Sequence, residues 1–123
     1  MVGLAEAMCA RLEYDLRYQK EGKQWELLAA RGRKAPDWFT VNPQLMPGED
    51  FFFQAFWDLN SDRNVGMSLG PIPWSSIQTY GLSKGLECDM IELLHVVIRS
   101  MDELFLRYMN EEQEKRSKAA ASK

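Results

Sequence analysis

Residues 86–116, LECDMIELLHVVIRSMDELFLRYMNEEQEKR, decide the fold because their apolar side chains follow a helical period. Large apolar residues recur every three or four positions, at Ile91, Leu94, Ile98, Met101, Phe105 and Tyr108. This spacing is a heptad seam, and a second stripe lies beside it at Met90, Leu93, Val97 and Leu104. An apolar face this wide predicts the central helix of a small bundle. The same seam would also serve a homo-oligomer formed through the 91–108 helix.

The large apolar residues stop after Met109, where the chain continues as NEEQEKRSKAAASK. A polar segment of this kind has nothing to bury against the body of the protein and is expected to fray. We therefore predict a single helical domain over residues 1–112, with the long helix over 86–112, and a flexible polar tail over 113–123.

The first part of the domain, residues 1–31, is predicted to form N-terminal helices. Leu4, Met8, Leu12 and Leu16 recur at every fourth position, which places them on one helical face. Gly22 is expected to divide the segment, and Gly32 supplies a stop. Residues 32–48 follow as a connector rich in proline and aromatic residues, which we expect to pack on the body.

Residues 49–85 are predicted to form an aromatic helix, a loop and a short helix. The stretch EDFFFQAFWDL, residues 49–59, begins with two acidic residues, which favour a helix N-terminus. Three consecutive phenylalanines also suit a β-strand, so that alternative stays open. Turn-forming residues fill 60–72, and a short helix should run from Trp74 to about Tyr80. The predicted fold class is all-α.

Composition and charge exclude several classes of function. The formal net charge of -3 gives no basic face for nucleic acid. No stretch approaches the roughly 18 apolar residues that span a bilayer, and the N-terminus lacks the pattern of a secretory signal. Cys9 and Cys88 form no paired motif, which indicates reduced thiols. We expect neither a nucleic-acid partner nor a membrane partner.

The candidate constellations for catalysis each lack a partner residue. Glu92 and His95 have the spacing of one metal-binding helix motif, but His95 is the sole histidine and a second motif is absent. Cys88 lies seven residues from His95, too far along one helix for a hydrogen bond. We therefore predict no catalytic residue, no metal site and no cofactor, and a protein that is not an enzyme.

Aromatic residues in the middle third are the better candidates for a functional surface. A helix over 49–59 would be apolar on more than one face, so part of it must be covered by the connector or by a partner. The candidate partner-binding residues are Trp38, Phe39, Phe51, Phe53, Trp57, Trp74 and Tyr80. Burial of these side chains inside the monomer is the alternative interpretation.

Roughly residues 51–110 resemble the downstream, lambda-like tail-assembly chaperones of long-tailed phages. The matching features are Ile72-Pro73-Trp74 with Ile77 and Tyr80-Gly81, the Gly85-Leu86 turn, and the run Ile98-Arg99-x-Met101-Asp102-x-x-Phe105-Leu106. The resemblance implies a protein that binds the phage tape measure protein in the bacterial host cytoplasm. It also implies recruitment of tail-tube subunits and absence from the finished virion.

Two other functions are compatible with the same residues. A small phage protein could bind and inhibit or divert a host defence or regulatory protein. A structural component of the virion is the third alternative. All three hypotheses require a protein partner.

Overall fold

The computed structural model describes residues 3–40, 43, 45, 47–63 and 69–121, and these residues form no β-strand. The elements in chain order are α1 (Leu4–Arg17), the π-helical turn η1 (Tyr18–Gly22), α2 (Lys23–Ala30), α3 (Asp37–Thr40), α4 (Glu49–Asn60), α5 (Trp74–Ser83) and α6 (Cys88–Ala121). The predicted all-α fold with a long C-terminal helix is confirmed.

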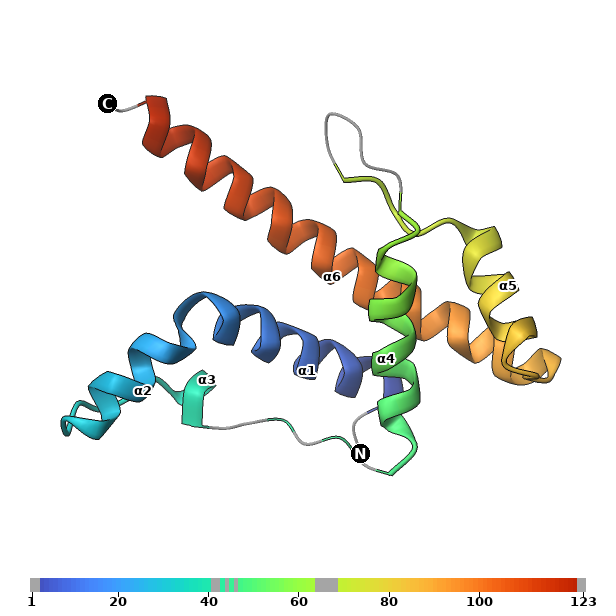
Figure 1. Ribbon diagram of the computed structural model, residues 1–123, viewed down its shortest axis with the longest axis horizontal. Helices are drawn as coiled ribbons and strands as arrows, with labels where there is room; N and C mark the ends of the chain where they lie inside the picture. Colours follow the sequence, from blue (N-terminus) through green and yellow to red (C-terminus); the bar gives the residue numbers. More distant parts are fainter. Residues whose placement is uncertain (1–2, 41–42, 44, 46, 64–68, 122–123) are drawn as a thin grey trace.

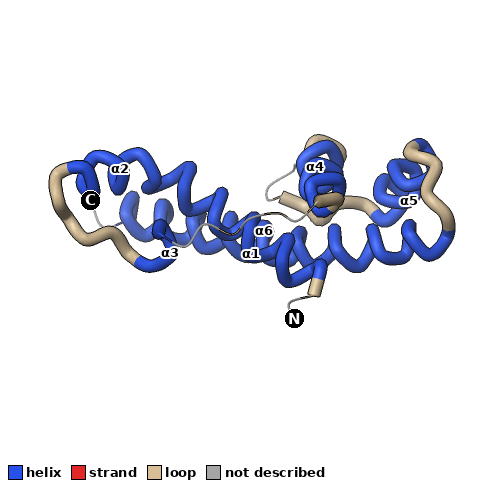
Figure 2. Tube along the Cα trace, turned by 90° about the horizontal axis from the view of Figure 1, so that it is seen from below, coloured by secondary structure: helices blue, strands red, loops and turns tan. Residues whose placement is uncertain are grey.

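Helix α6 runs through the whole molecule, and α1, α4 and α5 pack along it. Figure 1 shows α4 crossing α6 and α5 folding back on the first turns of α6. In Figure 2, α4 and α5 lie on the same side of the layer that α1 and α6 form. The chain is therefore a two-layered arrangement of helices with α6 at its centre.

The hydrophobic core lies where these helices meet α6. Its largest fully buried side chains are Phe56, Met8, Leu12, Ile77, Leu94, Ile98, Met101 and Val97. They come from α1, α4, α5 and α6, so no pair of helices forms the core alone. Burial of large apolar side chains at native packing density is the main stabilising term for a chain of this size.

The heptad seam of α6 belongs to this core. Ile91, Leu94, Ile98, Met101 and Phe105 are buried, and Tyr108 is half-buried. The chain's own helices therefore cover the seam, as the bundle interpretation predicts. A homo-oligomer through the 91–108 helix stays a prediction, and it would have to use the other faces of α6.

The segment with three consecutive phenylalanines is helical, which excludes the strand alternative. Phe52 and Phe56, four residues apart, are both buried, while Phe51 and Phe53 are half-buried on either side. Gly48 precedes the helix with a φ of 89°, a left-handed conformation that a glycine adopts without strain. Glu49 and Asp50 occupy the first turn, where the helix dipole favours negative charge.

The predicted end of the long helix is wrong. Helix α6 continues past residue 112 to Ala121, so the described part of the predicted tail, residues 113–121, is helical. Loss of apolar side chains does not end this helix, because glutamate, glutamine, lysine, arginine and alanine are the strongest helix formers. Neither proline nor glycine interrupts the segment.

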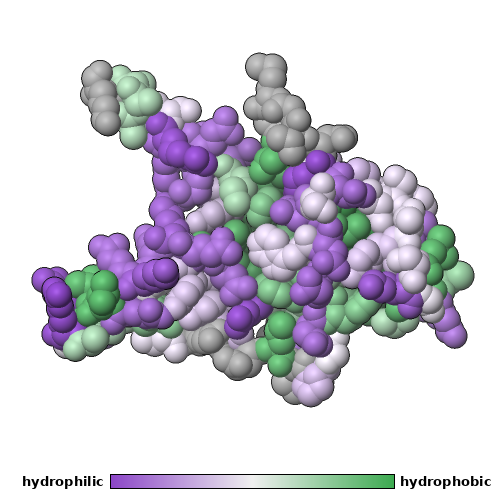
Figure 3. Space-filling view, viewed as in Figure 1, coloured by the Kyte–Doolittle hydropathy of each residue, from purple (hydrophilic) through white to green (hydrophobic). Residues whose placement is uncertain are grey.

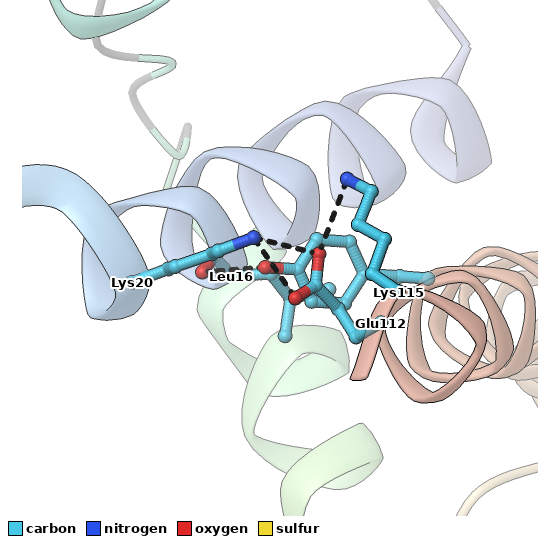
Figure 4. Close-up of polar contacts among 5 residues, drawn as sticks. Leu16, Lys20, Glu112 and Lys115 are labelled. Carbon is cyan, nitrogen blue, oxygen red and sulfur yellow. Dashed lines mark hydrogen bonds and ion pairs between the residues drawn. The ribbon is translucent and has the colours of Figure 1, made fainter. Parts of the chain in front are cut away.

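Polar contacts join the C-terminal half of α6 to the N-terminal helices (Figure 4). Lys20 Nζ donates to both carboxylate oxygens of Glu112 at 2.9 Å, and Lys115 lies 3.7 Å from the same carboxylate. Tyr108 Oη donates to the carbonyl of Leu16 at 3.3 Å. The hydrogen bond to Glu112 raises the pKa of Lys20, and the same bond lowers the pKa of Glu112. The Lys20–Glu112 contact is exposed and contributes little to stability, while the hydrogen bond from Tyr108 is partly buried.

The N-terminal segment divides at Gly22, as the sequence predicts. The π-helical turn η1 connects α1 to α2 there, without a break in the helix. A Cβ atom on Gly22 would lie 2.5 Å from the ring of Tyr18, so any larger residue would require that ring to move. The connector contains the short helix α3, which the sequence pattern did not predict.

We expect Phe56→Ala to lower the free energy of unfolding by about 3–5 kcal/mol and Ile98→Ala by about 2–5 kcal/mol. Both side chains are fully buried, so each truncation leaves a cavity. Urea denaturation followed by circular dichroism measures both values. Val96→Ala is the matched control, because Val96 is 57% exposed on the same helix as Ile98. Unchanged melting temperatures for both core variants would show that the core lies elsewhere.

Candidate protein-binding surface

The seven aromatic residues predicted to bind a partner lie on three different helices. Trp38 and Phe39 lie on α3, Phe51, Phe53 and Trp57 on α4, and Trp74 and Tyr80 on α5. Six of them are half-buried, and Trp74 alone is exposed. The structure therefore does not join them into one continuous surface, and their role in binding stays a prediction.

Trp38 and Phe39 pack against the N-terminal helices. The ring of Trp38 lies 6.2 Å from that of Tyr14, and the ring of Phe39 stacks on Tyr18 at 6.4 Å. The guanidinium of Arg17 lies 5.8 Å from the Trp38 ring. These contacts hold the connector on α1, which agrees with the expectation that it packs on the body.

The aromatic side chains of α4 pack on one another and on neighbouring helices. Trp57 contacts Phe53 at 6.3 Å and Phe105 of α6 at 6.1 Å, and Phe51 lies 6.3 Å from Tyr80. Tyr80 Oη donates to Asp58 Oδ2 at 2.8 Å. Burial and this hydrogen bond raise the pKa of Tyr80 to about 12. The group is therefore a packed junction between α4 and α5.

Trp74 differs from the other six, because 62% of its surface is exposed and its ring is held in a fixed place. The ring stacks on His95 of α6, with 5.0 Å between centroids and an interplanar angle of 20°. His95 is itself held by a 2.9 Å hydrogen bond between Nε2 and Gln78 Oε1. A large aromatic side chain that is ordered and exposed is the kind of residue that dominates binding at protein interfaces.

A pocket of about 330 Å³ opens beside Trp74, between α5 and α6. It is lined by Pro71, Ile72, Trp74, Ile77, Arg99, Asp102 and Glu103. Ile72 and Ile77 give it an apolar wall, and the exposed Arg99 and Glu103 stand at its edge. The pocket therefore has an apolar wall and an exposed aromatic ring beside it. The two charges at its edge, Arg99 and Glu103, are of opposite sign and lie one helical turn apart on α6.

One lining residue of this pocket, Asp102, belongs to a buried ion pair. Arg63 and Asp102 are 5% and 6% exposed, and Arg63 Nη2 lies 2.6 Å from Asp102 Oδ1. The other carboxylate oxygen accepts a hydrogen bond from the backbone N–H of Ile72 at 3.0 Å. Arg63 also donates to Asn60 Oδ1 at 2.8 Å and to the carbonyl of Gly70 at 2.9 Å. Both charged groups are thus hydrogen-bonded on more than one side, as buried charges must be.

The guanidinium of Arg63 also lies 4.8 Å from the ring of Phe105, so the pair is enclosed by the core. Sequence reasoning missed this pair, although Asp102 carried a signal. Asp102 follows Met101 directly and lies among the apolar positions of the seam. A carboxylate that is buried at such a position needs a buried partner. Nothing in the sequence pointed to Arg63, which lies in the turn-rich loop after α4.

Other exposed apolar side chains were also missed. Leu82 of α5 and Met90 and Val96 of α6 are 62%, 39% and 57% exposed. With Trp74, they give the α5–α6 end of the molecule more exposed large apolar side chains than any other part that the structure describes. In Figure 3, hydrophobic residues lie at the edge of this end, while hydrophilic ones follow most of the C-terminal half of α6.

The described residues contain no group of three or more histidine, cysteine, aspartate or glutamate side chains arranged to hold a metal ion. Within the same residues, no helix is both long and apolar enough to cross a membrane.

We expect Asp102→Asn to lower the free energy of unfolding by about 3 kcal/mol or more, because it leaves Arg63 buried without a counter-charge. Glu103→Gln removes a carboxylate from the next, exposed position and should change stability by less than about 0.5 kcal/mol. Urea denaturation of both variants measures the difference. Equal stabilities would mean that the ion pair contributes nothing to the folded state.

His95 predicts a dependence of stability on pH. Burial, and secondarily the positive charge of Arg99, lower the pKa of His95 below its ordinary value of 6.5. The unfolded chain therefore takes up this proton at a higher pH than the folded chain does. The free energy of unfolding should be highest above this ordinary value and should fall as the pH drops through 6.5 towards the lowered pKa.

Urea denaturation at about pH 7.5, 6.5 and 5.5 tests this dependence in the range where histidine titrates. His95→Gln should flatten the profile, because glutamine cannot be protonated and can still hydrogen-bond to Gln78. If the free energy of unfolding of His95→Gln falls with pH as steeply as that of the parent, groups other than His95 cause the dependence.

Comparison with known proteins gave one family. Searches of curated proteins and of solved structures found no match. A model of the phage tail assembly chaperone family matches residues 28–107, which confirms the resemblance and extends it towards the N-terminus. The matched segment runs from the end of α2 to the middle of α6, and it contains Trp74, His95, the pocket and both members of the buried ion pair. The chain belongs to the phage tail assembly chaperone family.

Proposed function

We propose that this chain is a non-enzymatic chaperone that binds the tape measure protein of its phage during tail assembly. Family membership supports a protein partner among the tail proteins. The proposal places the chaperone in the bacterial host cytoplasm, where tail proteins are assembled, and not in the finished virion.

The observation that carries the proposal is the exposed ring of Trp74 beside the pocket between α5 and α6. Both lie inside the matched segment. The ring is fixed by stacking on His95, so little conformational entropy is lost when a partner covers it. We propose this surface, and not the half-buried aromatic side chains of α3 and α4, as the main site of contact.

A client helix is the partner that this surface suits best. Tape measure proteins are long helical proteins with apolar stripes, which need cover before they assemble. A helix lying along the α5–α6 surface could place an apolar side chain in the pocket, against Ile72 and Ile77, while its polar residues meet Arg99 and Glu103. The proposal requires no conformational change in the core.

We expect Trp74→Ala to reduce the amount of tape measure protein that co-purifies with the chaperone by at least about tenfold, the loss typical of an interface anchor. Leu82→Ala is the matched control, because Leu82 is equally exposed at the other end of the same helix. Co-expression of tagged chaperone and tape measure protein, followed by quantitative mass spectrometry, gives the ratio.

Purification of the tagged chain from infected cells and mass spectrometry of purified virions separate the competing functions. If infected cells yield only a host protein in complex with the chaperone, the inhibitor of a host factor replaces the proposed function. Detection of the chain in purified virions at stoichiometric amounts would make it a structural component. Full retention of tape measure protein by Trp74→Ala would reject the proposed site.

A further inference from the structure

Helix α2 projects from the body of the molecule and contributes nothing to its core. Figures 1 and 2 show it at the end farthest from α5. None of its residues is buried, and its principal contact is with the adjoining turn η1. Leu27 is 66% exposed, more than Trp74. A single exposed leucine is common on protein surfaces, so its meaning depends on the residues around it.

The helix is held in a defined position despite its exposure. Tyr18 Oη of η1 donates a hydrogen bond to the carboxylate of Glu26, and the ring of Tyr18 stacks on Phe39 of the connector. At the other end, the N–H of Arg33 donates to the carbonyl of Leu28 at 3.0 Å, and Gly32 adopts a φ of 87°. This is a Schellman cap, which closes the helix and directs the chain back.

Basic side chains flank Leu27 on the same helical face. Lys23 precedes it by four residues, and Arg31, the C-cap residue that follows α2, comes four residues after it, so the three positions succeed one another at the helical spacing. Arg33 and Lys34 extend the positive charge past the helix end. All five side chains are exposed, and none of the four basic ones makes an ion pair with a described residue. In Figure 3, a hydrophobic patch near this end of the molecule lies between hydrophilic residues.

We propose that the stripe Lys23–Leu27–Arg31 is a second docking surface, which binds an acidic, amphipathic helical segment of a partner protein. Acidic residues one turn on either side of an apolar residue would meet Lys23 and Arg31, while the apolar side chain covers Leu27. The charge of the stripe selects an acidic partner, since residues 23–34 contain four basic side chains and one acidic one.

A protein segment suits this surface better than a nucleic acid or a membrane. Four cations around one apolar side chain make few phosphate contacts, and the chain as a whole carries a net charge of -3, which repels polyanions. The surface lies apart from Trp74, so a partner could occupy both places or either one alone.

Two synthetic alanine-based helical peptides test the proposal on the full chain. In one, a leucine is flanked at four residues on each side by glutamate, and in the other by lysine. Fluorescence anisotropy should show that the glutamate peptide binds at least about tenfold more tightly than the lysine peptide. This preference should weaken as salt screens the charges.

Leu27→Ala and Lys23→Glu should each weaken binding of the glutamate peptide by at least about fivefold, without lowering the melting temperature, since neither side chain is buried. Val96→Ala, an exposed apolar residue at the other end of the molecule, should leave the affinity unchanged. Equal affinity for the two peptides, or for the parent and Leu27→Ala, overturns the proposal.

Three further results would assign the stripe to a different occupant and would also overturn the proposal. One is tighter, Leu27-dependent binding to vesicles containing phosphatidylglycerol. The second is the same behaviour with a single-stranded oligonucleotide. The third is loss of self-association in Leu27→Ala, measured by sedimentation velocity, which would identify a second copy of the chain.

Discussion

The buried ion pair between Arg63 and Asp102 is the contact on which the arrangement of α4, α5 and α6 depends. Arg63 follows the last turn of α4, Asp102 lies in the middle of α6, and the second oxygen of Asp102 holds the N–H of Ile72 just before α5. The carboxylate of Asp102 on α6 therefore binds both the segment that follows α4 and the segment that precedes α5. Replacing such a pair with apolar residues can be neutral, but removing one partner leaves an uncompensated charge. The pair consequently acts as a constraint on geometry more than as a source of stability.

Periodic apolar side chains made most of the fold predictable. Ile91, Leu94 and Ile98 mark the buried face of α6 from sequence alone, because a helix repeats its faces every 3.6 residues. The end of α6 was not predictable in the same way. Beyond Met109, helix propensity and not burial maintains the helix, and an apolar pattern carries no information about propensity. The π-helical turn that ends at Gly22 was likewise not predictable from the apolar pattern, because it brings the ring of Tyr18 close to where a Cβ atom on residue 22 would lie.

The candidate binding surface was less predictable, because exposure depends on which neighbours a side chain meets in three dimensions. Phe53 and Trp57 look as available in the sequence as Trp74, yet each packs on a residue of its own helix or of α6. Trp74 is exposed because α5 turns Ile77 towards α6 and leaves Trp74 at the edge, over His95. Sequence reasoning could name the aromatic residues but could not rank them, since the ranking follows from how α5 sits on α6.

The two N-terminal helices differ in what they contribute to the core. Helix α1 lies outside the segment that matches the family, but its Met8 and Leu12 are fully buried in the same core as α6. The matched segment and α1 therefore fold as one unit in this chain. Helix α2 continues from α1 through η1 and buries nothing. A substitution in α1 must act first on the core, whereas a substitution at Leu27 leaves every core contact intact. The core therefore places no constraint on the side chain at position 27, so this residue can change while the fold persists.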